Sequence, residues 1–284
     1  MELEKAVSYY SFDGKGIRTY LCSCLAGFYN ISEKDISTVN RWVSDLHNAS
    51  LVMDDIEDDS QIRRCKPTSH LIYGVPVALS SASITIFRTL HEIQRTTTVG
   101  PEILELLYYA HVGQGIDIQH FTYKTKPNLL EYEKLVQYKT GNLLLILLEL
   151  ICYFGKNDEN FVNREIIKDA VIRFSIFYQI RDDYINLACP KYWKEKGFCT
   201  DIQDGKMNYL LLLANVNNVP LDLSCVDVES KKHLLQNMHV ARLFDETYDK
   251  LEELKTSVLN VLPIQNVFDL IPYHRFDLSN LELV

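Results

Sequence analysis

The sequence predicts an all-α protein that forms one large helical bundle around a central cavity. Glycine and proline are sparse, at 11 and 8 among 284 residues, and alternating strand-like patterns are hard to find. Apolar residues instead recur at helical spacing, and the hydrophobic fraction of 47% is enough for a sizeable core. No linker-like stretch and no repeat divides the chain, so we expect a single domain over residues 1–284.

Capping patterns predict where several helices begin. Ser32, with an acid three residues later, is expected to open a helix that runs to about Asp54. Pro101 is typical of a first helical turn, and Asn128 with Glu131 forms another capping pattern. We expect two helices buried nearly all round, at 143–151 and 171–180, and loops at 122–128, 189–204 and 215–227.

Charge and cysteine content exclude several classes of protein. The net charge is −9, and no basic stripe or polybasic cluster indicates binding to nucleic acid or to an anionic membrane. The 7 cysteines show neither a CxxC nor zinc-finger spacing. The start MELEKAVSYY has no signal-peptide pattern, and the apolar stretch 143–154 contains Glu149 and is too short to span a membrane. We therefore expect a cytoplasmic protein without a membrane span.

The first acidic run follows the apolar residues Leu51–Met53 and contains Asp54, Asp55 and Asp58. On a helix, Asp54 and Asp58 lie one turn apart on the same face, with Asp55 beside them. Hard carboxylate oxygens with room for water suit Mg²⁺. A solvated acidic helix end remains an alternative for this run by itself.

A second acidic pair, Asp182 and Asp183, follows the apolar run 172–178. Burying two adjacent carboxylates without partners is expensive, and Arg181 by itself cannot neutralise both. A buried salt-bridge network is as good an explanation of this pair as a metal site. Two such acidic sets on separate core helices favour the metal site.

Cationic side chains follow both acidic sets and also lie near the N-terminus. Arginine offers phosphate a planar fork and lysine a point charge. Each cation taken singly is a solvated surface group, but acids and cations in one cavity would bind a metal–diphosphate. The candidates are Lys15, Arg18, His47, Arg63, Arg64, Lys139, Lys196 and Lys206.

Six motifs occur in a fixed order between about residues 14 and 206: GKGIR, LHNASLVMDDIEDDSQIRRCKPTSHLIYG, GQGIDI, KTG, YQIRDDYIN and FCTDIQDGK. With them the chain resembles the isoprenyl diphosphate synthases, or trans-prenyltransferases, and within that family the eukaryotic geranylgeranyl diphosphate synthases. The resemblance implies the isoprenoid synthase type of helical bundle. It also implies a Mg²⁺-dependent enzyme that condenses isopentenyl diphosphate with dimethylallyl, geranyl or farnesyl diphosphate by ionisation, condensation and elimination. A homodimer or higher homo-oligomer is implied as well.

The same resemblance implies a role for each candidate. Asp54, Asp55, Asp58, Asp182 and Asp183 are implied to hold three Mg²⁺, with Asp183 shared or acting through a neighbour. Arg63, Lys139, Lys196 and Lys206 are implied to grip the allylic diphosphate, and Lys15, Arg18, His47 and Arg64 the isopentenyl diphosphate. Thr140 and Gln179 are implied to face the allylic carbocation, with Gln114 and Asp117 as support.

Product length is expected to depend on the wall before the first acidic run. In the family a bulky aromatic residue four or five positions before the first Asp stops the chain at fifteen carbons. Ser50 and Ala49 occupy those positions and are small, so we expect a twenty-carbon product. Phe87, Leu90 and Tyr108 are the deeper residues that could close the tunnel.

Three alternatives remain open. The first is a farnesyl diphosphate synthase. The second is a class I terpene cyclase, whose (N/D)DxxSxxxE motif is missing, since Asn186 and Pro190 occupy its later positions. The third is a non-catalytic partner subunit, which two intact acidic motifs argue against.

Overall fold

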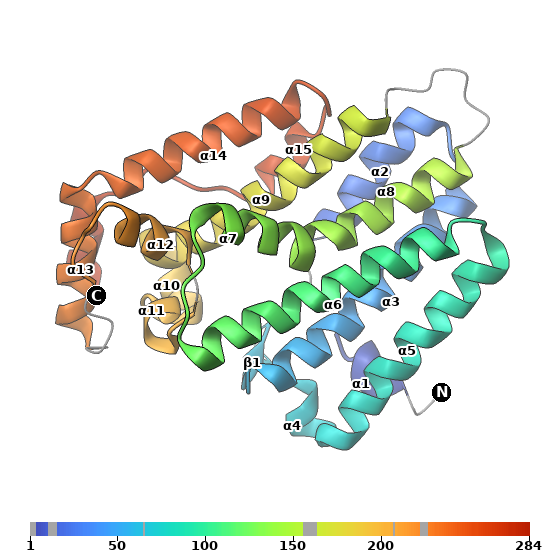
Figure 1. Cartoon of the computed structure of the whole chain (residues 1–284), viewed down its shortest axis with the longest axis horizontal. Coiled ribbons are helices and arrows are strands. Elements are labelled where there is room, and N and C mark those ends of the chain that lie inside the picture. The colour runs from blue at the N-terminus through green and yellow to red at the C-terminus, as the bar shows by residue number, and fades with distance from the viewer. Residues whose placement is uncertain (1–3, 11–15, 65, 156–163, 207, 222–226) are drawn as a thin grey trace.

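The computed structural model describes residues 4–10, 16–64, 66–155, 164–206, 208–221 and 227–284. In this part of the chain the all-α fold is confirmed, because a bundle of helices is interrupted only by one short hairpin (Figure 1). The N-terminal half contains α1 (Lys5–Ser8), α2 (Ile17–Tyr29), α3 (Glu33–Glu57), α4 (Ser69–Tyr73), α5 (Val75–Thr96) and α6 (Gly100–Tyr123). The antiparallel hairpin between α3 and α4 pairs β1 (Ile62–Arg63) with β2 (Lys66–Pro67).

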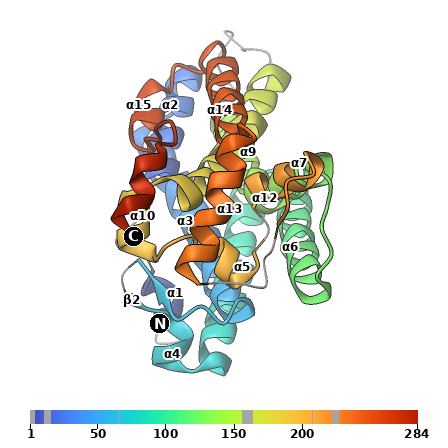
Figure 2. The same ribbon diagram turned by 90° about the vertical axis from the view of Figure 1, so that its left-hand side faces the viewer.

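The second half continues with one long helical stretch made of three parts, and then with a series of helices on the opposite side of the bundle (Figures 1 and 2). The long stretch is α7 (Leu129–Val136), the π-helix η2 (Gln137–Gly141) and α8 (Asn142–Phe154). The remaining elements are α9 (Arg164–Ala188), α10 (Pro190–Lys196), α11 (Thr200–Asp204), α12 (Tyr209–Val216), α13 (Val228–Val240), α14 (Leu243–Leu259), α15 (Gln265–Asp269) and the 3₁₀ helix η3 (Leu278–Leu283).

The three predicted helix starts are confirmed. The Ser32 side chain accepts from the Asp35 N–H at the start of α3, and Pro101 lies in the first turn of α6. Asn128 and Glu131 form a complete capping box at α7, in which each side chain bonds the other's backbone N–H. These caps satisfy N–H groups that have no partner within the helix, so they fix where each helix begins.

The expected loop at 189–204 is wrong, because α10 and α11 occupy most of it. Residues 122–123 likewise belong to α6. One helical stretch, Leu129–Phe154, is long and apolar enough to cross a membrane, yet 72% of its most apolar window is buried inside the bundle. That burial is typical of a core helix.

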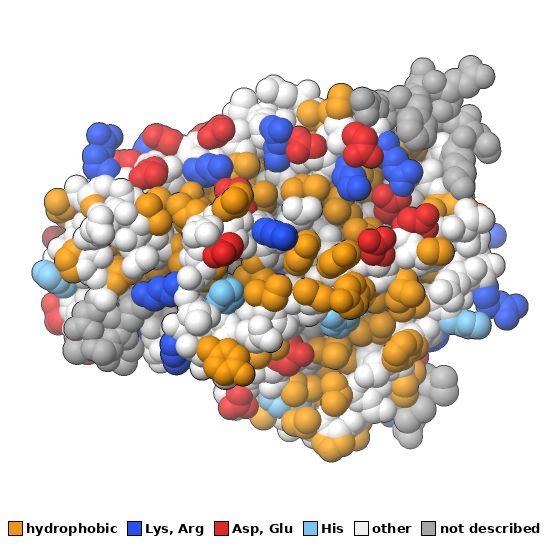
Figure 3. All heavy atoms as spheres, viewed as in Figure 1, with side chains coloured by type: hydrophobic (Ala, Val, Ile, Leu, Met, Phe, Trp, Pro, Cys, Tyr) orange, Lys and Arg blue, Asp and Glu red, His pale blue; other side chains and the backbone are white. Residues whose placement is uncertain are grey.

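Hydrophobic side chains also gather on one outer face of the molecule. Figure 3 shows them along α6 and at the edge formed by α4 and α5. The residues of this apolar face, each more than a third exposed, are Leu71, Ile72, Val75, Val77, Leu79, Phe87, Leu104, Tyr108 and Tyr109. Such a large exposed apolar face is typical of a surface that binds another protein.

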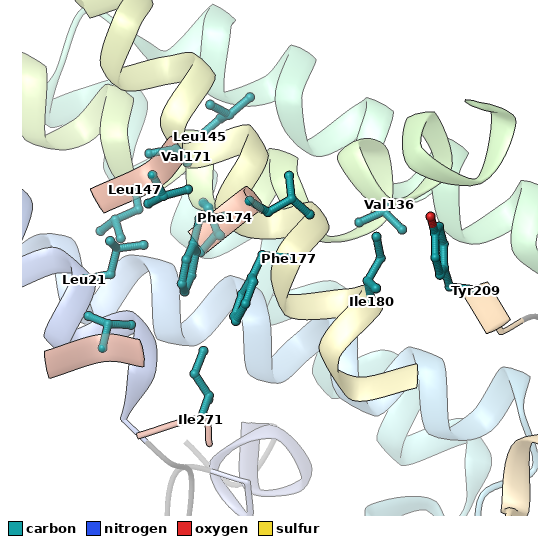
Figure 4. Packing of buried hydrophobic residues seen from close by; sticks show 14 of the residues in the cluster. Leu21, Val136, Leu145, Leu147, Val171, Phe174, Phe177, Ile180, Tyr209 and Ile271 are labelled. Carbon is teal, nitrogen blue, oxygen red and sulfur yellow. The ribbon is translucent and has the colours of Figure 1, made fainter. Parts of the chain in front are cut away.

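The core lies where α8 and α9 cross the bundle. α8 packs against α2, α3, α6 and α9, and α9 also packs along α14. Figure 4 shows Phe174 and Phe177 of α9 between Leu21 of α2, Leu147 of α8 and Ile271. The predicted all-round burial holds for 143–151, where only Leu143 is partly exposed, but is wrong for 171–180, where Arg173 is exposed and one face of α9 is only partly buried. The rigid core holds the acidic ends of α3 and α9.

Candidate active site

The first acidic run lies in the last turn of α3. Val52, one turn from the end, is buried against the core and fixes the orientation of the helix. The Asp54 and Asp58 side chains are 21% and 28% exposed, whereas the Asp55 side chain is fully buried. Asp54 and Asp58 therefore present carboxylate oxygens toward an accessible space, and Asp55 does not.

Cations from three distant parts of the chain contact Asp54 and Asp58. Arg63 of β1 donates to Asp54 Oδ2 at 2.8 Å, Lys139 Nζ of η2 lies 3.4 Å from Asp54 Oδ1, and Lys206 donates to Asp58 at 3.1 Å. Burial alone would raise the pKa of Asp54, but the charges of Lys139 and Arg63 outweigh it and hold the pKa below its usual value. Asp54 is therefore a carboxylate at neutral pH.

The position of Lys139 depends on the close approach of α6 to η2. A Cβ at Gly113 would lie 2.7 Å from Tyr138 Cβ and 2.8 Å from the Lys139 backbone N, so only glycine permits this packing. Lys139 Nζ then donates to Asp117 of α6 at 2.7 Å. Burial would lower the pKa of Lys139, but Asp54 and Asp117 raise it, so its ammonium stays charged.

Asp55 and Asp183 occupy positions that differ from the metal-binding role that the resemblance implies. Asp55 accepts from Arg63 Nε at 2.7 Å and from the Tyr10 hydroxyl on its other oxygen. Asp183 accepts from Tyr132 Oη at 2.6 Å, from the Tyr209 N–H at 2.7 Å and from Gln179 Nε2 at 3.0 Å. Because donors occupy both oxygens of each carboxylate, the geometry favours a positioning role for both.

The environment of Asp183 raises the pKa of its carboxyl group. Burial and the nearby charge of Asp201 raise the pKa of Asp183 well above the usual value. Its neighbour Asp182 is 39% exposed and pairs with Arg181 at 2.6 Å. Asp182 is therefore the accessible carboxylate of the second acidic pair.

A basic cluster lies beside the first acidic set and is composed of Arg18, His47 and Arg64. Burial and then the positive charges of Arg18, Arg64 and Arg63 lower the pKa of His47 well below its usual value. Burial and the charge of Arg64 lower the pKa of Arg18 to about 10. No ion pair joins Arg18 to a carboxylate among the described residues. Arg18 and Arg64 are thus two closely spaced, partly buried cations with a neutral imidazole beside them, an arrangement whose chemistry suits an anion.

A narrow pocket of about 60 Å³ opens between α6, α7, η2 and α9. Its lining includes Lys139, Thr140 and Gln179, which sequence reasoning had chosen as the catalytic residues, together with Asp117 and Tyr132. The pocket lining thus combines cationic and polar groups with the apolar side chains of Leu135 and Val136.

Two of the predicted cations are not placed at this site. Lys15 lies outside the described residues. Lys196 is exposed at the end of α10, and the structure gives it no hydrogen bond or ion pair with a described residue. Of the three deeper residues that were expected to be able to close the tunnel, Phe87 and Tyr108 are 72% and 61% exposed on the outer face. Leu90 is buried, as is Ala49.

The chemistry of the acidic groups fits Mg²⁺. Within the described ranges, no three His, Cys, Asp or Glu side chains are close enough to hold a metal by themselves. Mg²⁺ in proteins commonly takes only one or two carboxylates and completes its octahedron with water and substrate phosphate. Asp54 and Asp58 on α3 and Asp182 on α9 supply accessible carboxylates of this kind.

Sequence reasoning missed the tyrosines. The hydroxyls of Tyr10 and Tyr132 hold the two buried carboxylates through contacts 45 and 51 residues apart, and the backbone N–H of Tyr209 adds a contact 26 residues away. No local pattern marks a tyrosine for such a contact.

Comparison with known proteins agrees with this geometry. A family model described as Polyprenyl synthetase matches residues 1–238. A geranylgeranyl pyrophosphate synthase of Dictyostelium discoideum is 33% identical over 258 residues, which cover 87% of this chain and 82% of that protein. One of Clitopilus passeckerianus is 32% identical over 243 residues, covering 79% and 68%. A bifunctional sesterterpene synthase of Aspergillus aculeatus is 32% identical over 232 residues, covering 80% of this chain and 30% of that protein.

Proposed function

Because the chain belongs to the polyprenyl synthetase family, we propose that it is a Mg²⁺-dependent prenyltransferase that makes geranylgeranyl diphosphate. Its substrates are isopentenyl diphosphate and the allylic diphosphates dimethylallyl, geranyl and farnesyl diphosphate. The whole chain, 1–284, acts as one synthase domain. The relatives from Dictyostelium discoideum and Clitopilus passeckerianus are both named geranylgeranyl pyrophosphate synthases, which supports geranylgeranyl diphosphate as the product.

The observation that carries the proposal is the pairing of an acidic site with a separate basic cluster. Asp54, Asp58 and Asp182 suit a metal-bound diphosphate, whereas Arg18, His47 and Arg64 suit a diphosphate that needs no metal. A condensing enzyme binds two diphosphates, and a terpene cyclase binds one. The basic cluster therefore favours condensation over cyclisation.

Each residue then has a definable task. Asp54, Asp58 and Asp182 would hold Mg²⁺, with three ions per site as the family resemblance implies, and bound Mg²⁺ neutralises the charge that develops on the leaving diphosphate. Arg63, Lys139 and Lys206 neutralise the same phosphate oxygens. Asp55 holds Arg63 in place, and Asp183 holds Gln179.

The organic steps need no side-chain nucleophile. Ionisation of the allylic C–O bond leaves a carbocation, which the oxygen atoms of Thr140 and Gln179 face from η2 and α9. The alkene of isopentenyl diphosphate, held by Arg18, His47, Arg64 and Lys15, attacks this cation. The departed diphosphate takes the proton that is lost in the elimination.

The apolar face on α4, α5 and α6 supports a homo-oligomer, with a second copy of the chain covering it (Figure 3). The five cysteines that the structure describes are free, which supports a reducing compartment and hence the cytoplasm.

The test is an incubation of the pure protein with Mg²⁺, labelled isopentenyl diphosphate and each allylic starter in turn, followed by dephosphorylation and chromatographic sizing. We expect a C20 alcohol from all three starters. Asp58→Asn should lower kcat/KM by at least ~10²-fold, the size of a lost electrostatic stabiliser, whereas the exposed neighbour Asp59→Asn serves as the matched control. Hydrocarbon formed without isopentenyl diphosphate would instead identify a cyclase.

A further inference from the structure

Lys231 is a buried lysine that the proposed reaction does not use. It projects from α13 and is only 4% exposed. Its Nζ donates to the backbone oxygen of Phe198 at 2.9 Å and to Gln203 Oε1 at 3.2 Å, and it lies 5.9 Å from the Phe198 ring. No carboxylate among the described residues forms an ion pair with it. Burying an ammonium against neutral oxygens alone is costly.

What Lys231 contacts is the 197–206 segment, which follows α10 and contains α11. Three of its residues have left-handed backbone: Gly197, Cys199 and Gly205, at φ +104°, +49° and +66°. Cys199 is not glycine, so its Cβ crowds the backbone in this conformation. The segment therefore needs contacts from outside itself to keep this shape.

A second anchor reaches the same segment from α9. Asn186 Nδ2 donates to Thr200 Oγ1 at 2.9 Å and to Asp201 Oδ1 at 3.0 Å, and its Oδ1 accepts from the Asp201 N–H at 3.3 Å. An amide is needed here, because an aspartate would place two carboxylates against each other. Asn186 and Lys231 thus hold the segment from two helices. Figure 2 shows α13 on the side of the bundle that carries α10 and the C-terminus.

The segment ends with Lys206, whose Nζ reaches Asp58 of α3 at 3.1 Å. The Lys206 N–H also bonds the Asp201 backbone oxygen at 2.9 Å, so a shift of Asp201 moves Lys206 directly. The position of this cation over the acidic site therefore depends on the anchors behind the segment.

We propose that Lys231 is a positioning residue that fixes the 197–206 segment and thereby aims Lys206 at the allylic diphosphate, with Asn186 as its counterpart on α9. The aim at diphosphate rests on the proposed function, whereas the anchoring does not. Lys231 contacts no substrate in this role. Its effect on the reaction passes through the segment.

The first test measures hydrogen–deuterium exchange of the full-length protein without ligand. Lys231→Met keeps the apolar stem and removes the charge, and we expect at least a tenfold faster exchange in 197–206, with α9 and α14 unchanged. Lys255→Met is the matched control, because Lys255 also lies 5.9 Å from an aromatic ring, that of Phe268, on another helix. Unchanged exchange in Lys231→Met would overturn the proposal.

A second variant protects the test against misfolding. Gln203→Leu removes the same contact from the exposed side of the segment, and we expect faster exchange there as well. The second measurement is calorimetric binding of inorganic diphosphate with Mg²⁺. We expect Lys231→Met to bind it about tenfold more weakly and to show a raised KM for the allylic substrate. A lowered melting temperature with unchanged diphosphate affinity would reduce Lys231 to a structural residue and refute the inference.

The two proposals can fail separately. A wild-type protein that protects 197–206 but binds no diphosphate and condenses no substrate refutes the proposed function. Wild-type binding that Lys231→Met retains in full refutes the positioning role.

Discussion

Tyr10→Phe is the substitution that best tests how the first acidic set is held. The Tyr10 side chain is only 3% exposed, and its hydroxyl donates to Asp55 and accepts from the Ser69 N–H at 2.9 Å. Burial and the Asp55 hydrogen bond raise the pKa of Tyr10 to about 12, so the hydroxyl is a donor at every working pH. The change removes one oxygen atom and leaves the ring in place.

The cost follows from the two groups left behind. A buried N–H without an acceptor costs about 1–3 kcal/mol, and a hydrogen bond to a charged group contributes about 1.5–3 kcal/mol. Because water can partly replace the lost donor, we expect a loss of about 2–4 kcal/mol in the free energy of unfolding. For a chain of this size, that loss lowers the melting temperature by about 3–7 °C.

Activity should fall as well, since Asp55 holds Arg63 and would be free to rotate. We expect kcat to drop about tenfold, less than for loss of Asp58. Urea denaturation and steady-state kinetics with farnesyl diphosphate measure the two effects. Tyr9→Phe is the control, because the structure gives the Tyr9 hydroxyl no partner among the described residues. A Tyr10→Phe protein with wild-type stability and rate would refute the reasoning.

Three further predictions concern other parts of the site. Gly113→Ala should destabilise the protein by about 1–3 kcal/mol through overpacking against η2. Gly115→Ala, whose Cβ would meet nothing within 4 Å, is the control and should be neutral or stabilising. Melting temperatures of the two variants test this difference. Ser50→Phe, one helical turn before Asp54, should shift the product from C20 to C15, and an unchanged product on chromatography would place the tunnel floor elsewhere. The folded protein keeps His47 neutral while the unfolded chain binds a proton below about pH 6.5, so stability should fall on acidification by up to ~1.4 kcal/mol per pH unit from this group. His47→Gln should flatten that part of the urea-derived stability curve between pH 6.5 and 5.5, and an unchanged slope would contradict a neutral His47.

Local signals in the sequence predicted much of the fold. Ser32, Pro101 and Asn128 marked helix starts because capping depends on residues three or four positions apart. The apolar runs before both acidic sets predicted core helices, because such runs are stable only when they are buried. The π-helix at 137–141 had no such signal, and its close approach to Gly113 joins residues that are far apart in the sequence.

The sequence could not predict which acid of each adjacent pair is accessible and which is buried. Asp54 and Asp55 are adjacent and chemically identical, and only the fold decides that Asp55 points to Tyr10 and Asp54 to the pocket side. The same holds for Asp182 and Asp183. The α10 and α11 helices were missed because their short sequences gain their structure from contacts with α9 and α13.

The ion pairs between the acidic site and its cations have a consequence for turnover. Arg63 and Lys139 form ion pairs with Asp54, and Lys206 forms one with Asp58. If a metal–diphosphate binds as proposed, these cations would pass from the carboxylates to the phosphate oxygens, and Asp54 and Asp58 would become available to hold the metal. Each charged group would then keep an opposite charge beside it, and release of inorganic diphosphate would let the same ion pairs form again.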